Sequence, residues 1–238
     1  MRIFLAGAAG VIGRRLTPLL VLMGHDVTGT TRSAAKAGSI EAMCGRPVVV
    51  DVFDADALKR AVVAARPDVV IHQLTDLPDV NDPAKYAATR EANARIRIEG
   101  TRNLMAAAKA AGARRVIAQS IAFAYAPGPE PHRENDPLAL DGPGKRTAEG
   151  IMALEWAVLR TPPIEGVVLR YGRLYGPGTW TETPQGRGPL HVDAAAHAAL
   201  LALERGAGIY NIAEDDGSVA IIRARMELGF DPTMRLDA

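Results

Sequence analysis

The sequence contains a single cysteine, Cys44, among its 238 residues. One cysteine excludes an internal disulfide and any metal site built from several cysteines, and we expect no metal site. We expect Cys44 itself to be a small packing residue. The sequence also has no apolar run of about 18 residues, the length that a membrane-spanning helix needs, so we expect no membrane partner.

An excess of charge of one sign is also missing, because 28 Lys and Arg stand against 27 Asp and Glu, for a formal net charge of +1. This balance gives no reason to expect binding to nucleic acid or to a membrane surface. The first residues enter an apolar stretch rather than a cleavable leader, so we expect a cytoplasmic protein. With 48% hydrophobic and 23% charged residues, the composition is typical of an ordinary globular protein.

A glycine-rich turn does follow the first apolar stretch. Residues 3–6 suffice for one buried strand, and Gly7, Gly10 and Gly13 follow at a spacing of three as a helical pattern begins. In such a turn the first glycine adopts a positive φ, the second lets backbone N–H groups approach phosphate, and the third packs the helix closely. The open N–H groups at the helix start, where Val11 and Ile12 lie, favour an anion. We therefore predict a dinucleotide-binding turn; the alternative is an ordinary tight turn.

Apolar stretches alternate with helical patterns along the chain. Strands are predicted at residues 3–6, 26–30, 47–50, 68–73, 114–119, 166–170 and 208–211, and helices at 13–23, 34–44, 55–65, 89–111, 145–160, 192–203 and 219–228. This alternation predicts an α/β fold, a Rossmann-type doubly wound parallel sheet with helices on both faces. We expect an NAD(P)-binding domain at residues 1–170 and a small C-terminal substrate-binding appendage at residues 171–238.

The end of the second predicted strand bears on the choice between NAD and NADP. An Asp or Glu there would accept a hydrogen bond from the ribose 2′-hydroxyl and repel a 2′-phosphate. This chain instead has Thr31, Arg32 and Ser33, with no carboxylate before Glu41. A guanidinium and two hydroxyls suit a phosphate, so we expect NADP(H), with NAD(H) less favoured. The alternative is a solvated arginine in a loop.

Residues after the third and fourth strands complete the predicted cofactor site. Asp51 and Val52 follow the third strand, where the carboxylate could accept from the adenine amino group or cap the next helix. Gln73, Leu74 and Thr75 follow the fourth strand on the ligand side. We expect Leu74 and Thr75 to line the ribose and nicotinamide end.

These motifs and several others resemble the short-chain dehydrogenase/reductase superfamily, in particular its extended and atypical branch, the NAD-dependent epimerase/dehydratase family. The matching segments, in the family's order, are GAAGVIG at 7–13, VIHQL at 70–74, Asn93 with GTRNL at 100–104, VIAQS at 116–120, LRYGRLYGPG at 169–178 and HVD at 191–193. The resemblance implies a domain that binds NAD or NADP, with Asn93 and Gln119 at the cofactor, and a small-molecule substrate. It also implies a homodimer formed through the helices at 89–111 and 145–160.

The sequence departs from this family at its catalytic motif. Members with the usual chemistry carry Tyr-x-x-x-Lys, in which the lysine lowers the tyrosine pKa so that the phenol relays a proton. No tyrosine here is followed four residues later by lysine; Lys145 has the matching phase, but Asp141 stands at the tyrosine position. The segments that build the substrate domain are also shorter than in typical relatives. We therefore expect a shallow, wet substrate pocket.

Three side chains are candidates for the chemistry, each with a structural alternative. Ser120, at the end of the fifth strand, could bind a substrate oxygen or satisfy the loop backbone. Tyr125 could supply a phenol proton or pack beneath its loop. Lys145 could contact the nicotinamide ribose or be a solvated lysine at a helix start.

Other polar residues are assigned mainly structural roles. We expect His72 to be a satisfied, partly buried imidazole rather than a catalyst, and Arg170 to pair internally. Tyr171 and Tyr175 are expected to border the pocket, and Asp193 to cap the helix that follows it. The function predicted from all of this is an NADP(H)-dependent oxidoreductase acting on a small carbonyl/alcohol pair. The alternatives are a cofactor-binding sensor and a non-redox epimerase, lyase or cyclase on the same fold.

Overall fold

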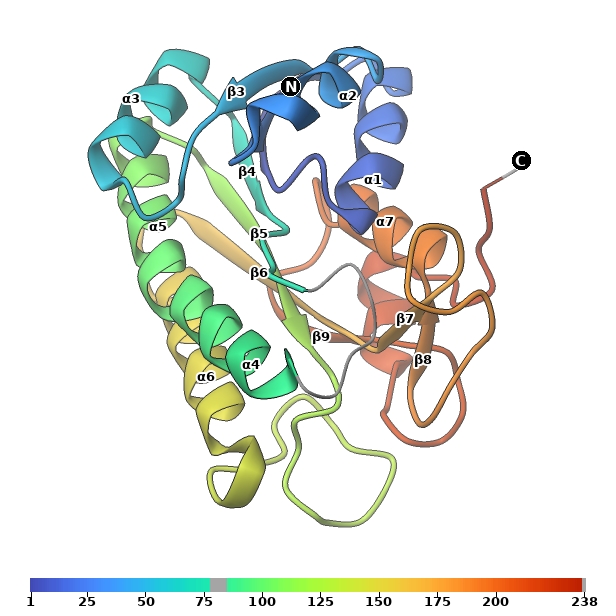
Figure 1. Ribbon diagram of the computed structural model, residues 1–238. Helices are drawn as coiled ribbons and strands as arrows, with labels where there is room; N and C mark the ends of the chain where they lie inside the picture. The colour runs from blue at the N-terminus through green and yellow to red at the C-terminus, as the bar shows by residue number, and fades with distance from the viewer. Residues whose placement is uncertain (78–84, 237–238) are drawn as a thin grey trace.

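A computed structural model describes residues 1–77 and 85–236 (Figure 1). Its centre is a sheet of seven parallel strands in the order β3-β2-β1-β4-β5-β6-β9. The strands are β1 (Arg2–Ala6), β2 (Asp26–Thr31), β3 (Arg46–Val49), β4 (Val69–His72), β5 (Arg115–Ile121), β6 (Glu165–Tyr171) and β9 (Gly208–Ile212). This order and the helices on both faces confirm the predicted Rossmann-type fold.

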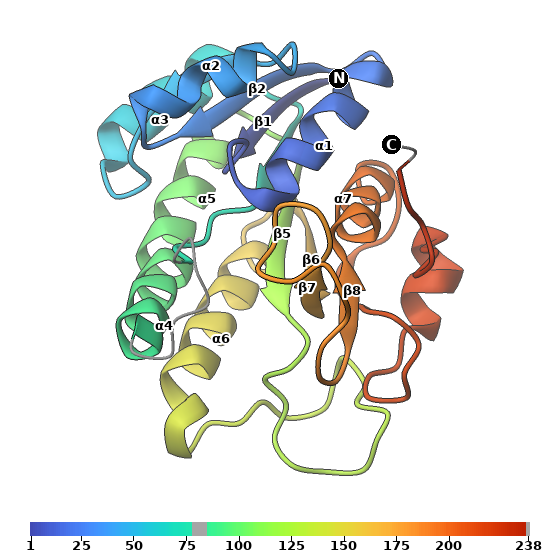
Figure 2. The same cartoon turned by 45° about the vertical axis from the view of Figure 1, so that its right-hand side comes forward.

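Helices cover the two faces of the sheet (Figures 1 and 2). One face carries α1 (Val11–Leu22) and α7 (Val192–Leu201), which pack against each other. The other carries α3 (Ala55–Ala65), α4 (Tyr86–Arg95), α5 (Thr101–Ala110) and α6 (Lys145–Leu159). Helices α4 and α5 join through a π-helical turn, η3 (Ile96–Gly100), so the helix predicted at 89–111 forms one nearly continuous rod.

The core lies on both sides of the sheet because successive strand residues point to opposite faces. Leu5 and Ile71 are buried on the α1 and α7 side, whereas Phe4 and Val70 are buried on the α5 and α6 side. Burial of both faces is the physical reason for the uninterrupted apolar strands in the sequence.

Several predicted boundaries are corrected. The helix expected at 34–44 is a 3₁₀ turn, η1 (Ala34–Lys36), followed by the short α2 (Ala37–Glu41). It ends early because Cys44 adopts a left-handed conformation with φ of 60°, a role that glycine usually fills. Cys44 is also exposed, so its expected packing role is wrong. The helix expected at 219–228 includes a π-helical segment, η5 (Ala224–Leu228).

The segment at 171–238, predicted as an appendage, also contributes to the main layers. Its strand β9 pairs with β6, and its helix α7 packs on α1. The predicted boundary at residue 170 therefore does not separate the sheet from the rest of the chain. The segment also holds two short paired strands, β7 (Arg173–Tyr175) and β8 (Pro189–His191). They flank the loop expected at 175–189, which is confirmed between them. No helix in the described part of the chain is long and apolar enough to cross a membrane.

Candidate functional site

The glycine turn after β1 leaves no room for side chains. Gly7 has a φ of 94°, and a Cβ atom added to it would lie 2.7 Å from the carbonyl oxygen of Gln73. A Cβ added to Gly13 would lie 2.3 Å from the carbonyl oxygen of Gly7. Both distances are far below van der Waals contact, so only glycine fits at either position. The close approach of β1, α1 and the end of β4 depends on these two residues.

The start of α1 presents backbone N–H groups at this turn. Gly10 is the N-cap, has no side chain to cap the helix, and accepts the first helical hydrogen bond from the N–H of Arg14 over 2.9 Å. The N–H groups of Val11 and Ile12 precede that bond and have no acceptor within the helix. A bare helix start beside a glycine cradle fits the pyrophosphate of a dinucleotide.

The loop between β7 and β8 lies beside the first turn of α1 (Figure 2). A Cβ added to Gly178 in this loop would lie 3.2 Å from Nη2 of Arg14. The segment after the sixth strand therefore approaches the same helix start as the glycine turn.

The predicted phosphate-binding residues lie together at the end of β2 and just after it, but they already have partners. Arg32 donates from Nη2 to Oδ1 of Asp76 over 2.6 Å. The hydrogen bond and charge of Asp76 raise the pKa of Arg32, with a smaller contribution from the charge of Asp51. The hydroxyl of Thr31 accepts from the N–H of Ser33 over 3.1 Å. Asp76 is a functional candidate that sequence reasoning missed.

Asp51 and Val52 follow β3 as predicted. The Oδ1 of Asp51 accepts from the N–H of Phe53, and the cap of α3 is Asp54, whose Oδ1 accepts from Ala57. The capping alternative for Asp51 is therefore wrong. Its carboxylate is exposed, and Val52 is half-buried beside it. The predicted contact of Asp51 with adenine stays a prediction.

The imidazole of His72 is buried and has both ring nitrogens occupied, as expected. Its Nδ1 accepts from the N–H of Leu74 over 3.2 Å, and its Nε2 lies 3.0 Å from Oγ1 of Thr101. Burial, aided by the positive charge of Arg97, lowers the pKa of His72 to about 4. A neutral ring with two partners has a structural role here.

Gln73 points into the protein beneath the glycine turn. Its Nε2 donates to the hydroxyl of Tyr171 over 3.2 Å, while its Oε1 is buried without a hydrogen-bond partner among the described residues. Burial raises the pKa of Tyr171, which lies within the core rather than at the border of a pocket as expected. Leu74 is half-buried, Thr75 is exposed, and Gln119 on β5 is half-buried. Their predicted cofactor contacts stay predictions.

Asn93 on α4 holds the segment that follows β4. Its Oδ1 accepts from the N–H of Asp76, and its Nδ2 donates to the carbonyl oxygens of Asp76 and Thr89. Both amide hydrogens are therefore used inside the protein. The side chain therefore fixes the backbone of Asp76, and the expected cofactor contact of Asn93 stays a prediction.

The hydroxyl of Ser120 does not face a substrate. Ser120 is fully buried and donates to Oε1 of Glu155 over 2.9 Å. Two hydrogen bonds of 2.8 and 2.7 Å join the same carboxylate to Arg170, which confirms the internal pairing expected for Arg170. Burial disfavours the charge of Arg170, but Glu155 outweighs this effect and raises the pKa of Arg170. The catalytic role expected for Ser120 is therefore wrong.

Tyr125 joins the loop after β5 to the edge strand β9. Its hydroxyl accepts from Arg170 over 2.9 Å and donates to Asn211 over 2.6 Å, and its ring stacks on His132. Burial raises the pKa of Tyr125. These contacts favour the packing alternative over proton donation. Lys145 is exposed at the first residue of α6, which suits a solvated helix-start lysine.

The chain beyond Tyr125 forms a hollow of about 430 Å³. Its lining comes from the single loop at 126–137, where His132 lies 3.3 Å from Oδ2 of Asp136. The hollow is therefore formed within one loop, apart from the residues of the glycine turn.

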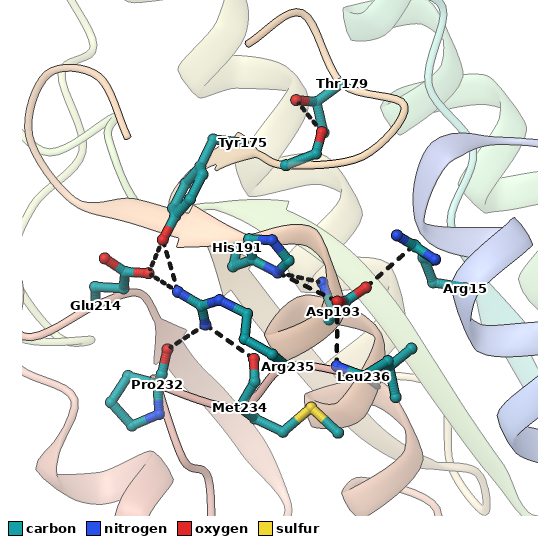
Figure 3. Close-up of polar contacts among 11 residues, drawn as sticks. Arg15, Tyr175, Thr179, His191, Asp193, Glu214, Pro232, Met234, Arg235 and Leu236 are labelled. Carbon is teal, nitrogen blue, oxygen red and sulfur yellow. Dashed lines mark hydrogen bonds and ion pairs between the residues drawn. The ribbon is translucent and has the colours of Figure 1, made fainter. Parts of the chain in front are cut away.

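The HVD segment at 191–193 connects α7 to its surroundings (Figure 3). The cap of α7 is His191, whose Nδ1 accepts from the N–H of Asp193, so the capping role expected for Asp193 is corrected. The carboxylate of Asp193 instead pairs with Nε of Arg15 on α1 and accepts from the N–H of Leu236.

A second set of contacts beside it holds the C-terminal segment (Figure 3). Tyr175 is buried and donates to Glu214, and Arg235 donates to both. Tyr175 therefore has a structural partner rather than a free hydroxyl. Nothing local in the sequence signals this network, because it joins residues from distant parts of the chain.

Comparisons with known proteins agree with this fold. The profile of the NAD dependent epimerase/dehydratase family matches residues 3–189. A Streptomyces protein named 3-diazoavenalumate denitrifying reductase is 41% identical, over 92% of this chain and 78% of its own. The UDP-glucose 4-epimerase of Thermotoga maritima superposes with a TM-score of 0.78 at 19% identity, covering 99% of this chain and 94% of that one. The Thermus thermophilus UDP-glucose 4-epimerase complex with NAD superposes with a TM-score of 0.73 at 24% identity, covering 98% and 85%.

Proposed function

The chain belongs to the NAD dependent epimerase/dehydratase family, and from this premise we propose that it is a nicotinamide-dependent reductase whose substrate accepts hydride without a proton from the protein. Residues Gly7, Gly10 and Gly13 would hold the pyrophosphate against the start of α1. The dinucleotide supplies the hydride when it is bound. The chain's own residues bind and orient the two reactants.

The observation that carries this proposal is that the two hydroxyls expected to bind or protonate a substrate oxygen are hydrogen-bonded inside the protein. Ser120 donates to Glu155, and Tyr125 donates to Asn211. Reduction of a carbonyl needs a proton at the oxygen, which a hydroxyl of this kind would deliver. The predicted carbonyl/alcohol substrate is therefore not the one that we propose.

An aryl diazonium ion is a substrate class that avoids this need. Hydride from the dinucleotide forms a C–H bond at the ring carbon. The C–N bond breaks, and its electron pair departs with N₂. The negative charge of the hydride cancels the positive charge of the diazonium ion, so no proton is taken up. The relative that is 41% identical is named for a denitrifying reduction of a diazo compound. We propose the same class of reaction here.

The test combines the full chain with NADPH deuterated on the nicotinamide ring and a benzenediazonium salt, measured against the rate without protein. We expect protein-dependent N₂ release and deuterium in the arene at the carbon that carried nitrogen. Tyr125→Phe keeps the stacked ring and should retain the rate. A loss of more than tenfold in this variant, with its fold intact, would contradict the proposal.

Parallel assays separate the other functions on this fold. Reduction of members of a carbonyl panel, without diazonium reduction, would restore the carbonyl/alcohol prediction. Binding of both nicotinamide forms without turnover would indicate a sensor. Product formation with no net change in the nicotinamide would indicate an epimerase, lyase or cyclase.

We further propose a preference for NADP(H), carried by Arg32. Its exposed guanidinium lies after β2 with no carboxylate on that strand's end, and it offers several donors to a 2′-phosphate. Arg32→Ala should weaken NADPH binding far more than NADH binding, as measured by calorimetry. Equal weakening of the two would discard the phosphate role.

A further inference from the structure

The ion pair between Arg32 and Asp76 bridges the two strands that flank β1. Arg32 follows β2 and Asp76 follows β4, and these strands pair with opposite sides of β1. The glycine turn begins where β1 ends. The pair therefore spans the carboxyl end of the strand that leads into the dinucleotide cradle, with Nη2 and Oδ1 only 2.6 Å apart.

Asp76 is held in place from behind. The amide of Asn93 bonds both the N–H and the carbonyl oxygen of Asp76, each over 3.0 Å, and is itself tied to the carbonyl oxygen of Thr89. Asn93 thus anchors the backbone of Asp76 to α4, and the carboxylate of Asp76 points at Arg32. The backbone of Asp76 is therefore fixed by the fold, whereas the side chain of Arg32 that it contacts is 66% exposed.

The charges around the guanidinium oppose a third phosphate. Asp76 is in contact with Arg32, and Asp51 lies near enough for its charge to act on the same group. A 2′-phosphate, which carries close to two negative charges, would be attracted by Arg32 and repelled by both carboxylates. An uncharged 2′-hydroxyl suffers no such repulsion and can donate to a carboxylate.

We propose that Asp76 is a specificity-determining residue for the dinucleotide. It lies in the segment after β4 and supplies the carboxylate that is missing at the end of β2. It lowers the preference for NADP(H) that Arg32 would give alone, so that the chain binds both dinucleotides. This inference rests on the proposed nicotinamide-binding function.

The test measures dissociation constants for NADH and NADPH by calorimetry on the full chain. Asp76→Asn keeps the shape and removes the charge, and Asp76→Ala serves if the first variant does not fold. We expect NADPH to bind about fivefold more tightly and NADH to bind equally or more weakly. The gain should shrink at high salt, because screening weakens the repulsion.

The matched control is Asp26→Asn. Asp26 forms an ion pair of the same length with Arg46, but it lies at the start of β2, at the amino end of the parallel strands rather than their carboxyl end. This variant should leave the ratio of the two dissociation constants unchanged.

A ratio unchanged in the folded Asp76 variants, with both dinucleotides bound, overturns the inference alone. A similar shift of the ratio in Asp26→Asn also overturns it, since the effect would then be one of net charge. Failure of the wild-type chain and the variants to bind either dinucleotide overturns the proposed function, and this inference with it.

Discussion

The hydroxyl of Ser120 donates a hydrogen bond of 2.9 Å to Oε1 of Glu155, inside the protein. The same carboxylate binds Arg170, so a serine expected at a substrate is part of a buried ion-pair network. A hydrogen bond to a buried charged group contributes to stability more than an ordinary one. Ser120 is therefore expected to contribute to the stability of the fold rather than to catalysis.

Ser120→Ala should lower the free energy of unfolding by about 1 to 2 kcal/mol and leave kcat unchanged. Denaturant unfolding and steady-state kinetics measure the two effects. Ser39→Ala is the control, because Ser39 makes only an exposed hydrogen bond to a backbone carbonyl and its loss should cost little. A large fall in kcat with unchanged stability would return Ser120 to the active site.

Gly13→Ala should abolish dinucleotide binding, because the new Cβ would lie 2.3 Å from the carbonyl oxygen of Gly7. Gly10→Ala should have a smaller effect, since the corresponding distance is 3.2 Å. Gly38→Ala is the control, because nothing lies within 4 Å of its added Cβ. Calorimetric titration with NADPH checks the order, and circular dichroism checks that each variant folds. Unaltered affinity in Gly13→Ala would remove the glycine turn from the site.

Acidification should destabilise the protein through His72. The pKa of His72 is about 4 in the folded protein and 6.5 in an unperturbed chain. Between these values the unfolded chain binds a proton that the folded chain does not, so the free energy of unfolding falls as the pH falls from 6.5 towards 4, by roughly 3 kcal/mol at most. Urea unfolding across this range, with the ring signals of His72 followed by NMR, measures both. Titration of the folded ring near pH 6.5 would show that the imidazole is not buried as described.

The chain should form a homodimer through α6 and η3. Ile98, Met152 and Trp156 are exposed by 36%, 48% and 68%, and the two elements that carry them pack side by side. Exposed apolar side chains on two neighbouring elements favour a second copy as their cover. Trp156→Asp should therefore give a monomer in sedimentation velocity, whereas Met226→Asp, at an exposed residue elsewhere, should not. A wild-type chain that sediments as a monomer at high micromolar concentration would contradict the dimer.

Local patterns were sufficient for the framework of this protein. The apolar strands, the helix periods and the three glycines predicted a Rossmann-type sheet, because burial on both faces and a tight turn each leave a mark on neighbouring residues. The same reasoning identified His72 and Arg170 as internal residues. It missed the early end of α2, since Cys44 takes a conformation for which glycine is the usual signal.

Tertiary structure alone decided which polar groups meet. Ser120 and Glu155 are 35 residues apart in the chain, and Arg32 and Asp76 are 44 apart. Sequence periodicity shows which face of an element is buried, but the register of packed elements selects the partner of each hydroxyl or carboxylate. The sequence therefore determined that a glycine turn would join β1 to α1, and only the folded arrangement placed Asp76 against Arg32 and paired Ser120 with Glu155 and Tyr125 with Asn211.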